Sequence, residues 1–315
     1  MLETGQKSFS YNLLSAIQQA NAGNLAAESV PAPLLTAYQN YRRLLSQARL
    51  QDTLSTPQKN AIKQLLLQQK AYLESGLAMC SYLQHCTLAE NSTPSPALLE
   101  FLLPIQQYCY QTYSHKANLL AQQTLQLLSI SNDDINFPVH NESPILAISK
   151  IEITSWLQDY VLLRGNAGAF ALHDPLHNTI RYSKGFIEDA IRGLLRVSCT
   201  QMESLLTQWQ QKWSWKMGNQ NSESFEIDLF LHHSTTLLDA LVRLCSAWLW
   251  LERASAARRQ LLGCRTLRPE DGAYCRGTIQ TCLYFYNYEL PYLKQQLDLL
   301  AQLDSTCLDM ELAWL

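Results

Sequence analysis

The chain has 315 residues, which is enough for one large domain or two ordinary ones. Gly and Pro are scarce at 11 residues each and charged residues make up 16%, so the composition favours helix over strand and predicts an all-α fold. A net charge of -3 leaves no broad basic field, which argues against a nucleic-acid partner. No apolar run reaches about 18 residues, and the amino terminus lacks a basic region followed by an apolar one, so neither a membrane span nor a signal peptide is predicted.

The cysteines indicate a reducing environment. There are nine of them, they are scattered, and none forms a C-x-x-C pair. This pattern fits reduced thiols in a cytoplasmic protein better than a disulfide framework.

The first half of the chain reads as long helices. Apolar residues at helical spacing predict helices over residues 11–20, 34–50, 55–88 and 97–128. Ser55, Thr56 and Pro57 predict a capped start for the third helix, because a hydroxyl cap and a proline in the first turn suit amides that have no helical partner. Residues 91–96 predict a turn, and Pro104 is expected to cause at most a bend.

The second half is more varied. Residues 131–143 read as a loop, 144–163 as helix, 164–178 as loop or broken helix, 180–213 as helix and 218–224 as a polar linker. Two long antiparallel helices are predicted over 228–262 and 269–303, with Glu270 and Asp271 suited to the positive end of the second. Short loops between long amphipathic helices predict an antiparallel bundle over 1–215 and a helical tail over 225–315 packed on it.

Several motifs resemble those of a known family. Residues 37–41 followed by Arg49-Leu50-Gln51 resemble a helix that ends in R-x-Q-G-R, residues 68–76 a K-A-x-x-E-G helix, and residues 98–105 the segment L-L-x-L-L-T-P-I. Trp248-Leu249, Leu290-Pro291 and residues 271–274, 283–286 and 309–312 have counterparts in the same order. The chain thus resembles the carboxy-terminal four-helix domain and helical tail of the long acyl-CoA dehydrogenases, flavoenzymes that desaturate acyl-CoA thioesters. The resemblance covers most of 34–130 and 228–315 and is thin between them.

The departures from this family fall where its chemistry takes place. The resemblance places a flavin-contacting turn, Q-V-H-G-G-x-G, at residues 126–132, which contain no glycine to allow close backbone approach. It aligns residues 158–168 with a motif in which a glutamate removes the α proton of the substrate. Asp159, Gly165 and Gly168 are retained there, but Arg164 replaces the glutamate, and a guanidinium cannot act as a base at physiological pH. Too few residues precede the first matching helix for the family's amino-terminal helical and β domains.

Arg49 and Gln51 are the cofactor-binding candidates. The resemblance aligns them with a pair that reaches the flavin phosphate across a subunit boundary, so they would complete a partner's cofactor site. The alternative is a solvated arginine at the end of a helix.

Two functional hypotheses follow from the resemblance. The favoured one is a helical relative without catalytic residues or a cofactor of its own, which acts as an assembly or regulatory partner in a homo-oligomer or in a hetero-oligomer with an acyl-CoA dehydrogenase. The alternative is an acyl-CoA dehydrogenase subunit completed by a partner chain that supplies the FAD and acyl-CoA pocket. A decaying remnant is the third hypothesis.

Other polar clusters contain residue types that bind metals. His173 and His177 have a spacing that metals use, with Asp174 beside them, but Pro175 is expected to interrupt the helix and no third ligand is evident. His232-His233 fits a polar helix start, and Asp133-Asp134 fits a solvated loop. No metal is therefore predicted.

The tryptophans Trp209, Trp213, Trp215, Trp248 and Trp250 are interpreted as core and interhelix packing, or as one group that faces another subunit.

Overall fold

The computed structural model describes residues 30–51, 54–88, 96–129, 166–217, 224–264 and 266–311, with the single positions 14, 15, 17, 18, 156, 159, 164 and 314. The helices are α2 (Ala32–Leu50), α3 (Thr56–Leu88), α4 (Pro96–Leu128), α6 (Ala167–Tyr182), α7 (Asp189–Met217), α8 (Ser224–Gly263), α9 (Pro269–Tyr284), the π-helix η5 (Phe285–Glu289), α10 (Leu290–Gln302) and α11 (Thr306–Asp309). None of the described residues belongs to a β-strand, so the predicted all-α fold is confirmed.

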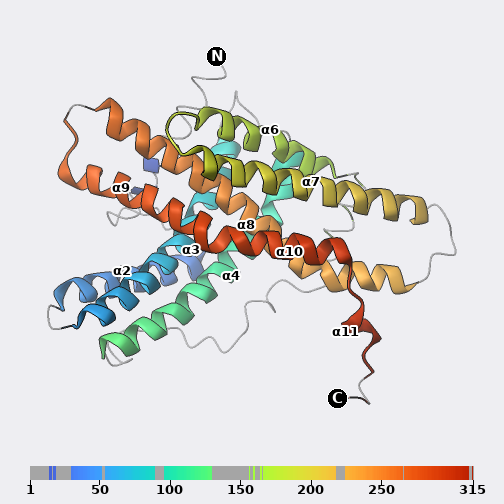
Figure 1. Cartoon of the computed structure of the whole chain (residues 1–315), viewed down its shortest axis with the longest axis horizontal. Helices are drawn as coiled ribbons and strands as arrows, with labels where there is room; N and C mark the ends of the chain where they lie inside the picture. Colours follow the sequence, from blue (N-terminus) through green and yellow to red (C-terminus); the bar gives the residue numbers. More distant parts are fainter. Residues whose placement is uncertain are drawn as a thin grey trace.

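The helices pack around a central α8 (Figure 1). Helices α2, α3 and α4 form one group, and α6 lies against α4 and pairs with α7. Helix α8 contacts α3, α4, α6 and α7, and on another side it contacts the long rod formed by α9, η5 and α10. In the part of the chain that is described, no helix is both long and apolar enough to cross a membrane.

The helix starts and ends in the first half follow from local chemistry. The Gln58 side chain accepts hydrogen bonds from the Ser55 amide at 3.0 Å and the Ser55 hydroxyl at 2.8 Å, and Pro57 occupies the first turn of α3. The predicted start near Ser55 and end at Leu88 are therefore confirmed. Helix α4 continues through Pro104, as expected. Helix α2 agrees with the prediction over 34–50 and begins two residues earlier.

The region around α6 corrects two predictions. The loop or broken helix predicted over 164–178 is wrong, because α6 is continuous through Pro175 and begins after Asn166, which takes the left-handed conformation at φ 59°. The single helix predicted over 180–213 is also wrong. The chain turns over residues 183–188, where Gly185 has φ 83°, a value that glycine adopts without strain, and α7 begins at Asp189.

The carboxy-terminal helices agree with the prediction except at one place. Helix α8 and the following rod form the expected antiparallel pair, with Glu270 and Asp271 in the first turn of α9. The rod contains η5, where the amide of Leu290 donates to the carbonyl of Phe285, five residues earlier. Pro291 has no amide hydrogen to continue the α-helical ladder at this point, which favours the wider turn.

Some predicted elements lie outside the described residues. These are the loop over 131–143, most of the helices predicted over 11–20 and 144–163, the turn over 91–95 and the linker over 218–223. The division of the chain into units 1–215 and 225–315 stays a prediction.

One hydrophobic cluster includes residues of each of the described helices α2, α3, α4, α6, α7, α8, α9, η5 and α10. Trp248 and Trp250 are buried, and their indole N–H groups donate to Thr179 and Ser75, each at 2.8 Å. Trp209 packs edge-on against Phe230 with ring centroids 5.5 Å apart. These three tryptophans therefore serve core packing, while the side chains of Trp213 and Trp215 lie outside the described residues.

An ion pair buried inside the core joins α3 to α8. The Arg253 and Glu74 side chains are both 0% exposed, and Arg253 Nη2 lies 2.5 Å from Glu74 Oε2. The Arg253 guanidinium also lies 4.2 Å from the ring centroid of Trp250 and 3.4 Å from the hydroxyl of Tyr274 on α9. Because water cannot reach this cation, Glu74 is the group that neutralises it.

Replacing Glu74 with Gln is expected to leave Arg253 buried without a countercharge. We expect Glu74→Gln to lower the free energy of unfolding by about 3–5 kcal/mol. Arg268→Gln is the control, because it breaks the pair with Asp271 in which Arg268 is 76% exposed, and it should change the free energy of unfolding far less than Glu74→Gln does. Urea denaturation of both variants measures the difference. Equal effects would contradict this account of the core.

Candidate functional site

Arg164 lies at the surface between two carboxylates. Its Nε is 2.9 Å from Asp159 Oδ2 and its Nη1 is 2.9 Å from Glu100 Oε2 on α4. The three side chains are 49%, 37% and 52% exposed, in the order Arg164, Asp159 and Glu100. The guanidinium thus pairs with both carboxylates in a solvated setting, and because it does not lose a proton at physiological pH it cannot accept one as a base.

The residues after Arg164 are held by packing against α4 and α7. The Asn166 side chain donates to the backbone carbonyl of Leu206 at 2.8 Å, which fixes the start of α6. A Cβ atom on Gly168 would lie 2.4 Å from Cβ of Phe101, far inside van der Waals contact. Gly168 therefore serves close approach between α6 and α4, while Gly165 lies outside the described residues.

The cofactor candidates Arg49 and Gln51 are close in sequence but have different surroundings. Arg49 is exposed in the last turn of α2. Gln51 donates from Nε2 to the carbonyl of Leu128 at 3.1 Å, and so satisfies one of the free carbonyls at the end of α4. The next residue, Ser129, has φ 54° and lies within the segment 126–132 that the resemblance aligns with the flavin contact. Residues 130–132 of that turn lie outside the described part.

The histidine pairs differ from each other. His173 and His177 lie together on α6, which is continuous through Pro175, so the expectation that Pro175 interrupts the helix is wrong. Glu203 of α7 lies beside them and is a third potential ligand that was not evident in the sequence. His232 and His233 lie inside α8, and Nε2 of the buried His233 is 2.9 Å from the carbonyl of Asp304. Asp133 and Asp134 lie outside the described residues.

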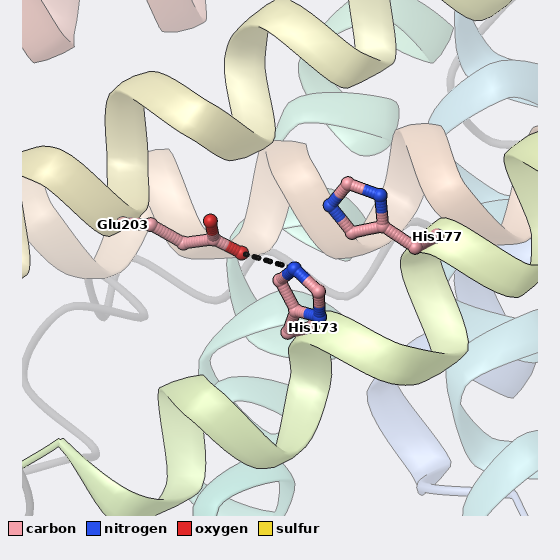
Figure 2. Close-up of side chains that lie close together, drawn as sticks. All are labelled: His173, His177 and Glu203. Carbon is pink, nitrogen blue, oxygen red and sulfur yellow. Dashed lines mark ion pairs between the residues drawn. The ribbon is translucent and has the colours of Figure 1, made fainter.

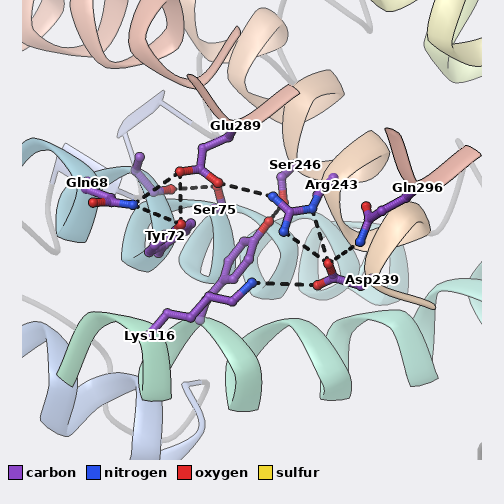
Figure 3. Close-up of polar contacts among 11 residues, drawn as sticks. Gln68, Tyr72, Ser75, Lys116, Asp239, Arg243, Ser246, Glu289 and Gln296 are labelled. Atoms are coloured by element: carbon purple, nitrogen blue, oxygen red, sulfur yellow. Dashed lines mark hydrogen bonds and ion pairs between the residues drawn. The ribbon is translucent and has the colours of Figure 1, made fainter. Parts of the chain in front are cut away.

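A polar network lies between α3, α4, α8 and the rod (Figure 3). Its first part surrounds Glu289 in η5. Tyr72 donates its hydroxyl to Glu289 Oε1 at 2.9 Å, Gln68 donates to the same oxygen at 3.4 Å, and Arg243 Nη1 donates to Glu289 Oε2 at 3.1 Å. Glu289 is buried, so these three donors replace the water that a carboxylate needs.

The second part of the polar network surrounds Asp239. Arg243 reaches Asp239 Oδ2 from Nε at 3.2 Å and from Nη2 at 3.0 Å, and Gln296 of α10 donates to the same oxygen at 2.6 Å. Lys116 of α4 lies 3.7 Å from Asp239 Oδ1, and its ammonium group is 5.7 Å from the ring centroid of Tyr72. The network thus joins α3, α4, α8 and the rod through two cations and two anions.

The charges in this network hold each other ionised. Burial alone would raise the pKa of Asp239, but the charges of Lys116 and Arg243 together hold it below its ordinary value. Burial lowers the pKa of Lys116, and Asp239 and Glu289 oppose that shift. Burial, assisted by the Glu289 charge, raises the pKa of Tyr72, so the phenol stays protonated and donates. A balanced set of charges of this kind stabilises a junction between helices and leaves no carboxylate without a cation beside it.

The sequence contained one signal for this network. Asp239 and Arg243 are four residues apart, at helical i, i+4 spacing, in a largely apolar stretch, where charged residues require partners. Their partners Lys116 and Glu289 lie far away along the chain, so only the packing of α4 and η5 against α8 brings them together.

The fold and its polar junction define an all-α helical bundle with a long two-helix tail. Residues 177–311 match a protein family described as Acetyl-CoA dehydrogenase C-terminal like. This segment is therefore similar to the carboxy-terminal helical domain of acyl-CoA dehydrogenases, and the resemblance predicted from the motifs is confirmed over these residues. None of the curated proteins compared with the chain matches it.

The residues that match the family are not the same as the residues that carry the motifs. It begins at His177 in α6 and includes α7, where the motif resemblance is thin, and it continues through α8, α9, η5 and α10 into the residues after α11. Residues 34–130 lie outside the match, so the resemblance of α2, α3 and α4 to the family stays a prediction.

Gly168→Ala tests the close contact between α6 and α4. The added methyl group must displace Phe101, so we expect the free energy of unfolding to fall by roughly 1–3 kcal/mol. Gly193→Ala in α7 is the matched control, since no atom lies within 4 Å of the new Cβ, and it should raise stability by roughly 0.5–1 kcal/mol. Thermal unfolding of the two variants measures the sign of each effect, and a stabilised Gly168→Ala protein would contradict the packing described.

The pH dependence of stability tests the charge on Asp239. Because the pKa of this residue is lower in the folded protein than the ordinary 3.8, its charge stabilises the fold above that value, and the contribution is lost as pH falls through the folded pKa. Asp239→Asn should therefore be less stable near pH 7 and lose less stability than the parent between about pH 4 and about pH 2. Asp228→Asn changes an exposed acid and should keep the parental profile. Parallel curves for parent and Asp239→Asn would contradict the assignment.

Proposed function

We propose that this protein is an acyl-CoA dehydrogenase relative that has no dehydrogenase activity of its own and serves as an assembly or regulatory partner. It associates with itself or with a complete acyl-CoA dehydrogenase. The observation that carries the proposal is Arg164, which lies between Asp159 and Glu100 at the position where the resemblance places the proton-abstracting glutamate.

The chemistry of this position supports the absence of catalysis. Removal of an α proton requires a group that accepts a proton at working pH, in a site that excludes water. Arg164 is a permanent cation, and the neighbouring Asp159 and Glu100 are exposed to solvent and bound to its N–H groups. The glycine-free turn after α4 gives no support for flavin contact through the backbone.

An aromatic surface on the rod supports association. Tyr288 of η5 and Tyr292 of α10 are 58% and 52% exposed and lie one helical turn apart. Tyr288 stacks on Tyr284 with ring centroids 4.8 Å apart, and the Arg243 guanidinium lies 5.5 Å from the ring of Tyr292. Rigidly held tyrosines and a nearby arginine are typical of the centre of protein interfaces. This Tyr288–Tyr292 surface is the contact that we assign to the partner.

The subunit alternative has one observation in its favour. Arg49 is exposed at the end of α2, where its guanidinium is accessible to a phosphate held by another chain. Under this alternative the partner supplies FAD and the acyl-CoA pocket, and the pair of chains becomes yellow and active.

Absorption and mass measurements on the purified protein test the proposal. We expect a colourless protein without acyl-CoA dehydrogenation, which forms an oligomer or a stable complex with an acyl-CoA dehydrogenase from the same host by light scattering. The double variant Tyr288→Ser with Tyr292→Ser should dissociate the assembly, whereas Leu262→Ser, at another exposed apolar side chain on α8, should not. We also expect no turnover from Arg164→Glu, since this change restores a base without the flavin turn.

Three outcomes would contradict the proposal. A monomer at every concentration that binds no acyl-CoA dehydrogenase would exclude the partner role. Bound flavin with dehydrogenase activity, alone or in the complex, would favour the subunit alternative. Loss of that flavin in Arg49→Ala would identify Arg49 as the residue that contacts it. Turnover by Arg164→Glu would show that the remaining machinery is intact.

A further inference from the structure

Three side chains from two helices converge on the side of the bundle formed by α6 and α7 (Figure 2). His173 and His177 come from consecutive turns of α6, and Glu203 comes from α7. His173 Nε2 lies 3.9 Å from Glu203 Oε1, and one ligand atom from each residue lies within 4.8 Å of the other two. Two imidazoles and a carboxylate are a set of donors that zinc uses in proteins.

The distances are close to those around a bound metal ion. Zinc binds imidazole nitrogen and carboxylate oxygen at about 2.0–2.2 Å, so ligand atoms around it lie roughly 3.3 Å apart in a tetrahedral arrangement. Rotation of side chains alone can bring the three groups to that spacing, because the His173 side chain is 43% exposed and the Glu203 side chain 29% exposed. The backbone of α6 and α7 needs no rearrangement.

Asp174 supplies the outer contact that metal-binding histidines commonly have. Its Oδ1 lies 3.2 Å from Nδ1 of His173, on the opposite side of the ring from Glu203. A hydrogen bond there places the proton on Nδ1 and leaves the lone pair of Nε2 directed at the site. Glu203 and Asp174 carry two negative charges beside the imidazoles, against the positive charge of Arg196 nearby, so the balance of charge favours a cation.

The rigidity of the two helices adds to the argument. Pro175 leaves α6 unbroken, so His173 and His177 keep the i, i+4 spacing that puts both rings on one face. Their rings stack with centroids 4.0 Å apart, and neither ring makes a hydrogen bond to the other helix that would have to be given up. Buried apolar residues, among them Leu172, Leu176 and Leu206, hold α6 against α7 beneath the site.

We propose that His173, His177 and Glu203 form a site for a divalent transition metal ion, with zinc as the best match, which fastens α6 to α7. Three protein ligands leave a fourth position for water or for a donor from a bound partner. Asp174 acts as a positioning residue through His173. The inference is independent of the assembly role proposed above, since it rests on side chains of α6 and α7, whereas Tyr288 and Tyr292 belong to η5 and α10.

Zinc binding to the full chain tests this site. The exposed thiols of Cys264 and Cys307 are first replaced by serine in every protein, to remove competing soft ligands. We expect the parent to bind one equivalent of zinc in a chelator-competition titration and to show a higher Tm with zinc. Cobalt in place of zinc should give the visible absorption bands of a protein-bound ion.

Variants of the ligands separate this site from incidental binding. Asp174→Asn removes an outer contact and should weaken zinc binding by roughly 10- to 100-fold. His177→Gln and Glu203→Gln each remove a direct ligand and should weaken zinc binding by more than that. His115→Gln, which changes an exposed histidine on α4, is the matched control and should bind as the parent does. Circular dichroism confirms that the variants keep their helices. No bound equivalent in the parent, or the same affinity in Glu203→Gln and His177→Gln as in His115→Gln, would overturn the proposal.

Discussion

The structure depends on the requirement that a buried guanidinium be neutralised. Arg253 lies in the last third of α8 with none of its side chain exposed, and Glu74 of α3 is its countercharge. An apolar core permits many similar packings, whereas a buried charge permits only those in which its partner lies within contact distance. The pair therefore sets how α3 lies along α8, and Tyr274 extends the same constraint to α9.

Polar contacts repeat along the same boundary between the first helices and the tail. Trp250 donates to Ser75, and Ser246 donates to the hydroxyl of Tyr113 at 3.3 Å. Farther along, Lys116 of α4 pairs with Asp239 of α8, and Tyr72 of α3 donates to Glu289 of η5. Long and mostly apolar helices have several ways to pack. Hydrogen bonds and ion pairs at three positions along α8 explain how these helices adopt one alignment. They also join residues 34–130, known to us through motifs, to the segment matched by the family.

The sequence predicted the helix ends that are decided by residues within one helical turn. The ends of α3 follow from Ser55, Gln58 and Pro57, which act within one turn, so they were accessible without a structure. The break expected at Pro175 was wrong because a proline in the middle of a helix costs stability without ending the helix when the surrounding packing compensates for the lost hydrogen bond. The turn at Gly185 was missed because a single glycine within a helical pattern is a weak signal.

The functional clusters were harder to predict for a different reason. Arg164 was found through a motif, and its exchange is visible in the sequence alone. Glu203 and Glu289 act on side chains of other helices, and no local pattern identifies them. The position of Glu203 opposite His173 arises only after the chain reverses between α6 and α7. Contacts of this kind belong to tertiary packing, which periodicity does not encode.

The π-helix has a consequence for everything that follows it. Such a turn holds one residue more than an α-helical turn, so the side chains after Glu289 are rotated by about 100° around the axis compared with an uninterrupted helix. This phase shift is what turns Leu293, Leu297 and Leu300 inward, where each is at most 4% exposed. A single additional residue in η5 thus decides which face of α10 packs inward. Deletion of one residue there would turn Leu293, Leu297 and Leu300 toward water.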